Sequence, residues 1–178
     1  MEVSVQNKLF FYTLTGIIFT ILIGTLSHFF YEWSRYNTYI GLVVPVNESV
    51  WEHIKIIFFP MFLFCSVENI LLQKEYPRIY KANACAIYTG AFSIPVIFFT
   101  YTGILGKNYL ACDIAVFCLS VVLAFCFGYK LAKNVPPSSC KTKSKIAACY
   151  YAAVLPLFLC FVLFTLYPPT NIGLFQTP

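Results

Sequence analysis

Long apolar runs separated by short polar stretches dominate the pattern of hydrophobic and polar positions along the chain. The runs cover residues 9–30, 54–72, 82–105, 109–131 and 146–167. An α-helix needs about 20 apolar residues to cross the roughly 30 Å hydrocarbon core of a bilayer, so each run predicts one transmembrane helix. Because no Pro/Gly/Ser-rich linker or internal repeat divides the sequence, we predict a single membrane domain over residues 1–178.

The stretch over residues 36–50 fits this pattern less well. Its apolar part, Tyr39–Val46, contains Pro45 and is followed by the polar residues Asn47 and Glu48. Even a helix over all of residues 36–50 would reach only about 22 Å, which is too short to cross the core. We therefore predict a re-entrant or interfacial hairpin. The expected fold class is an all-α integral membrane protein with five transmembrane helices plus this hairpin, and the alternative is six transmembrane helices.

Composition agrees with a membrane protein, and charge indicates its orientation. The chain is 60% hydrophobic and 11% charged, whereas soluble domains average about 45–50% and about 25%. The net charge of +5 is not gathered into a basic groove, which excludes nucleic-acid binding as a class. With five crossings, nine of the 12 Lys and Arg residues fall on the side of the N-terminus. This side is predicted to be cytoplasmic, with the C-terminus outside.

Charge does not choose between five and six helices, because both arrangements divide the Lys and Arg residues nine to three. The tryptophans favour five. In that arrangement Trp33 and Trp51 both lie in the outer interfacial belt, where indole rings are enriched.

Polar residues of the predicted spans gather at the outer end in the five-helix arrangement. His28 and Glu32 are four residues apart, as are Glu48 and Glu52, and in a helix this spacing puts both side chains on one face. Imidazoles with carboxylates suit a divalent ion such as zinc, iron or manganese, and they also relay protons. The predicted metal ligands are His28, Glu32, Glu48, Glu52 and His53. A substrate or proton path is assigned to Asp113, Asn47 and Glu68.

A purely structural role is the alternative for these residues. The string Ser49-Val50-Trp51-Glu52 has the spacing of a capping box, with Ser49 as N-cap, and would begin a helix there. The acidic residues would then form ion pairs. The expected partners are Arg35 for Glu32, Lys55 for Glu52, Lys107 for Asp113, and Lys74, Arg78 or Lys81 for Glu68.

The small residues and the cysteines carry weaker signals. Gly16, Thr20 and Gly24 form a small-xxx-small strip on the first helix, which lets another backbone approach closely. The strip serves either internal packing or a seam for a homodimer or partner helix, while lipid is the expected partner elsewhere. Most of the eight cysteines lie in apolar runs and one, Cys140, in a basic loop. We expect free thiols that act as small hydrophobes.

Two strings carry a resemblance to a known family, namely residues 28–34 (His-Phe-Phe-Tyr-Glu-Trp-Ser) and 45–55 (Pro-Val-Asn-Glu-Ser-Val-Trp-Glu-His-Ile-Lys). The chain resembles an uncharacterised family of small multi-pass bacterial integral membrane proteins, a domain of unknown function with an Asn-Glu-Ser-Val-Trp-Glu-His motif. The matching segments also include residues 59–60, 101–108, 167–169 and 174–175. The resemblance implies a bacterial plasma membrane location and no particular activity. It also implies a chain truncated after Pro178.

Three classes of function remain open. The first is a cation- or proton-linked binding or transport protein, which would use the whole cluster without a particular nucleophile. The second is a metal-dependent membrane hydrolase or lipid-modifying enzyme, with Glu48 or Glu52 as general base. The third is a non-catalytic membrane subunit or scaffold. The first class is preferred, and the sequence leaves open whether the protein is an enzyme.

Overall fold

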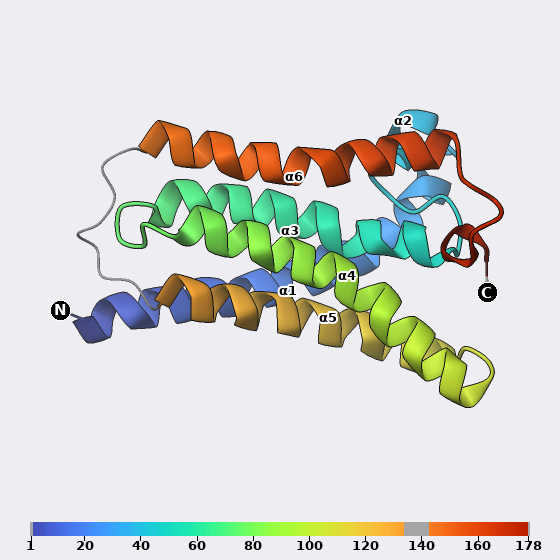
Figure 1. Ribbon diagram of the computed structural model, residues 1–178, viewed down its shortest axis with the longest axis horizontal. Helices are drawn as coiled ribbons and strands as arrows, with labels where there is room; N and C mark the ends of the chain where they lie inside the picture. Colours follow the sequence, from blue (N-terminus) through green and yellow to red (C-terminus); the bar gives the residue numbers. More distant parts are fainter. Residues whose placement is uncertain (1, 134–142, 178) are drawn as a thin grey trace.

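A computed structural model shows a bundle of long helices that lie side by side (Figure 1). The structure describes residues 2–133 and 143–177, with side chains from residue 7 and from residue 147 onward in the two ranges. The predicted basic loop with Cys140, and Pro178, lie outside these residues. The helices are α1 (Glu2–Trp33), α2 (Thr38–Gly41), α3 (Val50–Leu72), α4 (Ile79–Leu105), α5 (Leu110–Lys133), α6 (Lys143–Leu166) and the 3-10 helix η2 (Gly173–Phe175).

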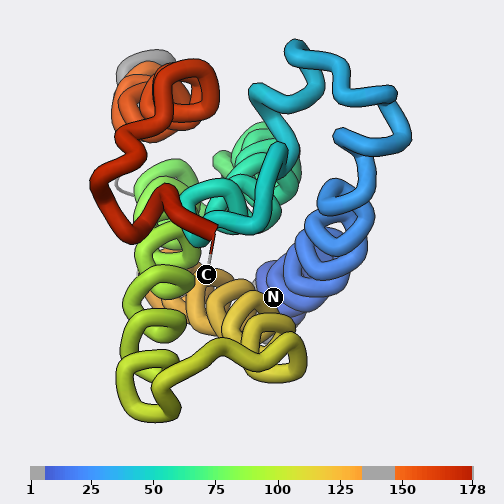
Figure 2. The backbone as a smooth tube through the Cα atoms, turned by 90° about the vertical axis from the view of Figure 1, so that its right-hand side faces the viewer, coloured from blue at the N-terminus to red at the C-terminus, as the bar shows by residue number. Residues whose placement is uncertain are grey.

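Five of these helices, α1 and α3 to α6, are long and apolar enough to cross a membrane. The all-α fold class with five transmembrane helices is therefore confirmed, and the protein is a multi-pass membrane protein. Residues 36–49 form no spanning helix and contain only the four-residue α2. Figure 2 shows this segment looping outward at the end of the bundle where α1 stops and α3 starts.

Helix α3 lies at the centre of the packing, because it contacts α1 on one side and α4 on the other. Its fully buried side chains include Ile57, Met61, Cys65 and Leu72, a spacing that forms one stripe along a helix. Helix α6 packs on α3 mainly through aromatic rings. The ring of Phe161 lies 5.0 Å from that of Trp51 and 4.8 Å from that of Phe58, centroid to centroid.

The small-residue strip of α1 packs inside the chain, against α3 and α5. A Cβ atom at Gly24 would overlap the carbonyl oxygen of Ile56, and one at Gly16 would overlap the ring of Phe125. Thr20, between them, is fully buried. Of the two alternatives for the strip, the structure therefore shows internal packing, and a homodimer or partner-helix seam through these residues has no free surface.

The two ends of the bundle differ in charge. The N-terminus, the α3–α4 turn, the last turn of α5 and the start of α6 lie at one end (Figure 1). We call it the basic end, since Lys74, Arg78, Lys130 and Lys133 belong to these elements and Lys81 to the adjacent first turn of α4. The end of α1, α2, the α4–α5 turn and η2 lie at the opposite end (Figure 1). The described cysteines are free thiols, as predicted.

Candidate metal site

Three side chains from different parts of the chain meet at the opposite end of the bundle. His28 comes from the last turns of α1, Glu48 from the loop before α3, and His53 from the first turn of α3. The two imidazole Nε2 atoms each lie 3.5 Å from a carboxylate oxygen of Glu48. One ligand atom from each residue lies within 4.8 Å of the other two. The three residues form the candidate metal site.

Local hydrogen bonds explain why Glu48 lies outside helix α3. The side chain of Asn47 accepts a bond from Ser49 N at 2.9 Å, which makes a tight turn around Glu48. Ser49 is the N-cap of α3, and its hydroxyl accepts a bond from Glu52 N at 3.4 Å. The N-cap thus comes directly after Glu48 and the helix begins at Val50, so Glu48 lies outside the helix with a side chain that is 66% exposed.

One of the two imidazole rings, that of His53, is oriented as a metal-binding imidazole is. Nδ1 of His53 lies 2.9 Å from the carbonyl oxygen of Ser49. A carbonyl only accepts, so Nδ1 carries a proton, and Nε2 is the ring atom that faces Glu48. His28 also points Nε2 at Glu48, while its Nδ1 is buried and has no hydrogen-bond partner among the described residues. Both rings are about two-thirds buried, with side-chain exposures of 32% and 28%.

The distances in this cluster are too long for strong ion pairs. Charge-assisted N–H···O bonds measure about 2.7–2.9 Å, whereas both contacts here are 3.5 Å. Two ligands about 2.0–2.1 Å from a tetrahedral zinc ion lie roughly 3.4 Å apart. Two imidazoles and one carboxylate are also a known set of zinc ligands, which leaves the fourth position open. The cluster thus has the donor chemistry for a divalent ion, with one ligand atom from each of the three residues within 4.8 Å of the other two.

Glu32 and Glu52 lie outside the candidate metal site, although the sequence placed them in it. Glu32 is exposed on the last turn of α1 and forms no ion pair with a described residue, Arg35 included. Glu52 is buried on another side of α3. The i, i+4 argument fails for Glu48 and Glu52 because Glu48 precedes the N-cap and is not helical.

Glu52 instead joins a buried ion pair with Lys55, at 2.6 Å. The ammonium of Lys55 also donates to the carbonyls of Gly41 and Val44, and Glu52 accepts from Val46 N at 3.0 Å. The other oxygen of Glu52 accepts from the hydroxyl of Thr165 in α6, at 3.3 Å. These bonds attach the loop between α2 and α3, and the end of α6, to the first turns of α3.

The residues assigned to a substrate or proton path, Asn47, Asp113 and Glu68, lie in three separate places. Asn47 shapes the turn before α3. Asp113 accepts hydrogen bonds from Tyr101 of α4 and from Asn108 of the α4–α5 turn. It forms no ion pair with Lys107. Lys107 lies over the ring of Tyr109 instead.

Glu68 lies near the basic end, where it is buried and accepts a bond from Asn83 at 2.9 Å. It forms no ion pair with a described Lys or Arg. The amide of Asn83 also donates to the side chain of Asn69, at 2.9 Å. Three polar side chains near the end of α3 and the start of α4 thus bond one another within the apolar bundle, while Nδ2 of Asn69 has no partner among the described residues.

Sequence reasoning missed Thr165, Asn83 and Tyr101, which are the partners of Glu52, Glu68 and Asp113. Each is a lone polar or hydroxyl-bearing side chain inside an apolar run, which is the signal that such a residue has a partner. The sequence gives the presence of a partner but not its identity. The Glu52–Lys55 pair was named in the structural alternative, and the structure shows it.

A comparison with protein families identifies the family of the chain. The model of DUF6512, described as a family of unknown function, matches residues 1–177. The chain belongs to this family. The resemblance stated from the sequence, to an uncharacterised family, is confirmed, and membership of DUF6512 assigns no activity.

One curated protein gives a distant match. Heme A synthase of Ehrlichia canis (strain Jake) is 28% identical over 129 residues, which are 67% of this chain and 36% of that protein. The chain thus spans about a third of the length of this relative. No solved structure matches the chain.

Proposed function

We propose that this membrane protein binds a divalent metal ion, with zinc as the preferred ion, through His28, Glu48 and His53. The observation that carries the proposal is the convergence of three ligand atoms within 4.8 Å from three separate parts of the chain. The hydrogen bond from Nδ1 of His53 to the carbonyl of Ser49 supports the proposal further, because such a bond fixes the orientation of a metal-binding imidazole ring.

Binding is favoured over transport by what lies between the two polar regions. Glu68 follows His53 by 15 residues on α3, a separation of about 22 Å. Between Lys55 and Ser66 the buried side chains of α3 are apolar, including Ile57, Phe58 and Met61. An ion or proton crossing the bundle along α3 would find no charged or hydroxyl side chain over residues 56–65, so we propose that the ion enters and leaves on one side.

Binding is also favoured over hydrolysis. A metal-activated water needs a general base beside it. Glu48 is used as a ligand, and Glu52 already accepts bonds from Lys55, Val46 and Thr165. Neither of the two carboxylates considered as the general base is therefore free to act on a water at the proposed metal.

A free ion is favoured over heme, although the name of the distant relative points to heme chemistry. The rings of His28 and His53 have centroids only 5.4 Å apart, and the carboxylate of Glu48 contacts both. A porphyrin held between these rings would have to displace Glu48. We also propose that the basic end faces the cytoplasm of a bacterial cell, which puts the metal site on the outer side.

Isothermal titration of the purified chain in detergent micelles, after removal of metal with a chelator, tests the proposal. With zinc chloride as titrant, the unmodified chain is expected to bind one ion. His28→Ala, His53→Ala and Glu48→Gln are expected to lower zinc affinity by more than the roughly 10–100-fold loss that second-shell changes cause. Glu32→Gln is the matched control, since it removes an exposed carboxylate one turn from His28, and it should bind zinc normally.

The proposal is overturned if zinc does not bind, or if Glu32→Gln weakens binding as much as Glu48→Gln does. Addition of hemin provides a second readout by absorbance spectroscopy. A heme spectrum that depends on both His28 and His53 would replace the free ion with heme as the ligand.

A further inference from the structure

A groove of about 550 Å³ lies between α4, α5 and α6, far from the metal site. This volume is in the range of roughly 300–1,000 Å³ found for small-molecule sites. Helix α4 lines most of it, opposite Phe127 of α5 and the early part of α6. The lining residues in α4 are Tyr80, Lys81, Ala84, Cys85, Tyr88 and Thr89.

The groove is apolar along its length and open at its side. The hydroxyl of Tyr88 donates to the carbonyl of Ala153 at 2.5 Å, and that of Thr89 to the carbonyl of Cys85 at 2.8 Å. These bonds occupy two of the hydroxyl groups of the lining. Phe127, which also lines the groove, is 43% exposed. A side opening within the bundle's apolar span admits lipid rather than a water-soluble ligand.

The groove has the length of one lipid leaflet. Its α4 lining extends from Tyr80 to Thr89, nine residues apart and therefore about 14 Å along the helix. This is about half of the roughly 30 Å hydrocarbon core. Since α4 starts at Ile79 at the basic end, the groove runs from that end to the middle of the bundle, as an acyl chain of the adjacent leaflet does.

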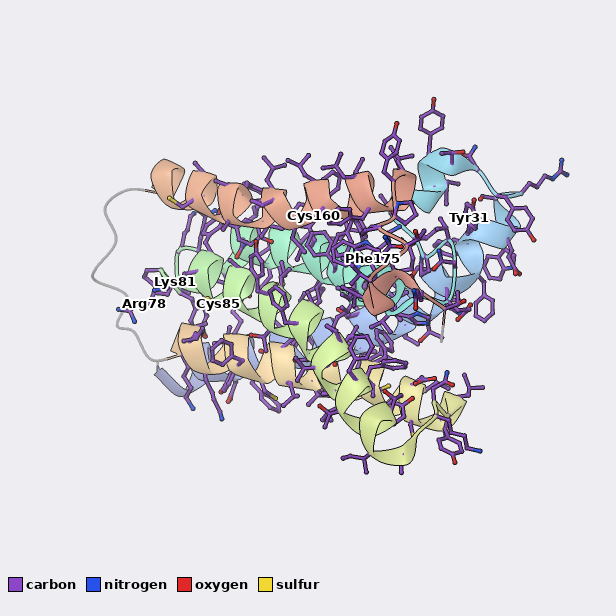
Figure 3. All side chains as sticks on the ribbon, turned by 45° about the vertical axis from the view of Figure 1, so that its right-hand side comes forward. Tyr31, Arg78, Lys81, Cys85, Cys160 and Phe175 are labelled. Atoms are coloured by element: carbon purple, nitrogen blue, oxygen red, sulfur yellow. The ribbon has the colours of Figure 1, made fainter. Side chains whose placement is uncertain are left out.

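Cations stand at the end of the groove where a lipid headgroup would lie. Lys81 lines the groove and is exposed, and Arg78 is one turn before it. Figure 3 shows Arg78, Lys81 and Cys85 following one another at the start of α4. Neither Arg78 nor Lys81 forms an ion pair with a described acidic residue, whereas Lys8 nearby is neutralised by Glu75.

We propose that this groove binds one anionic phospholipid, with an acyl chain along α4 and the headgroup phosphate beside Arg78 and Lys81. Basic pockets between transmembrane helices on the cytoplasmic side bind anionic headgroups in this way. The proposal is independent of the metal site, because it uses other residues at the other end of the bundle.

Native mass spectrometry of the full chain in detergent micelles, with added phosphatidylglycerol or phosphatidylcholine of identical acyl chains, tests this site. The unmodified chain is expected to retain one phosphatidylglycerol in preference to phosphatidylcholine. Arg78→Gln and Lys81→Gln are each expected to weaken phosphatidylglycerol binding by about fivefold, and to leave phosphatidylcholine binding unchanged.

A variant that fills the groove separates the acyl-chain contact from the charge effect. Ala153→Phe places a ring in the groove from an exposed position of α6 and is expected to abolish retention of both lipids. Ala152→Phe is the matched control, because Ala152 is equally exposed on α6 and does not line the groove. It should retain lipid as the unmodified chain does.

Four results would overturn the proposal. They are equal retention of the two lipids by the unmodified chain, lipid retention by Ala153→Phe equal to that of Ala152→Phe, competition by inorganic phosphate alone, and a dimer mass that Ala153→Phe converts to monomer. The third would mean a headgroup site without an acyl chain. The last would make the groove an interface between copies of the chain.

Discussion

Glu48 and Glu52 are four residues apart at the start of α3, yet they have opposite surroundings. The side chain of Glu48 is 66% exposed and contacts two imidazoles at 3.5 Å, a distance too long for strong hydrogen bonds. That of Glu52 is 3% exposed and lies 2.6 Å from the ammonium of Lys55. A carboxylate whose oxygens are already hydrogen-bonded holds the structure together. One that lies beside two imidazoles without strong bonds is available to bind a metal ion.

The difference follows from the position of the N-cap. Ser49 begins the helix, so Glu52 is fixed on a helical face that points into the bundle. Glu48 belongs to the loop and follows the turn made by Asn47. The buried ion pair in turn attaches that loop, since Lys55 binds the carbonyl of Gly41. The Glu52–Lys55 pair therefore supports the candidate metal site without belonging to it.

The largest effect is expected for Lys55→Met. Removal of one partner of a buried ion pair leaves an uncompensated charge and costs about 3–5 kcal/mol of stability. Unfolding of the chain in detergent micelles measures this loss. Lys107→Met, at an exposed lysine of the α4–α5 turn, is the matched control and should change stability by less than about 0.5 kcal/mol. A loss of stability below about 1 kcal/mol for Lys55→Met would mean that the Glu52–Lys55 pair does not stabilise the attachment of the loop to α3.

A smaller effect, seen only with metal, is expected for Glu48→Gln. In the absence of zinc its stability should stay within about 0.5 kcal/mol of the unmodified chain, because the side chain is exposed. With free zinc at about 100 times the dissociation constant, the unmodified chain gains about 2.7 kcal/mol and the variant gains nothing. The same unfolding measurement, with and without zinc, checks this. A large loss in the absence of zinc would assign Glu48 a structural role like that of Glu52.

A loss of about 1 kcal/mol is expected for Thr165→Val, the value of one net hydrogen bond. The hydroxyl of Thr165 bonds both Glu52 and the carbonyl of Phe161. Thr15→Val is the control, because the hydroxyl of Thr15 bonds only a backbone carbonyl one turn earlier. Thermal unfolding compares the two variants. Equal losses would show that the bond between α6 and Glu52 contributes nothing.

The smallest effect is expected for Glu32→Gln, which should change neither stability by more than about 0.5 kcal/mol nor zinc affinity. Glu32 is exposed and has no ion-pair partner among the described residues. Calorimetric titration with zinc and thermal unfolding together check this. A clear loss of zinc affinity would return Glu32 to the ligand set that the sequence predicted.

The sequence by itself determined the fold class and the number of spanning helices, because long apolar runs and the length of a helix leave few alternatives. It also determined the cap at Ser49, which depends only on neighbouring residues. His28, Glu48 and His53 were all among the predicted ligands. These features are local, so they are visible in the order of the residues.

Only the tertiary structure decided which polar residues share a site. His28 and Glu32 occupy adjacent turns of one helix, but of the two only His28 lies close to Glu48 and His53, which come from other parts of the chain. The partners of Glu52 and Glu68, Thr165 and Asn83, come from other helices. Such pairings depend on how helices are rotated and offset against one another, and that is set by packing over the whole bundle rather than by spacing along one segment.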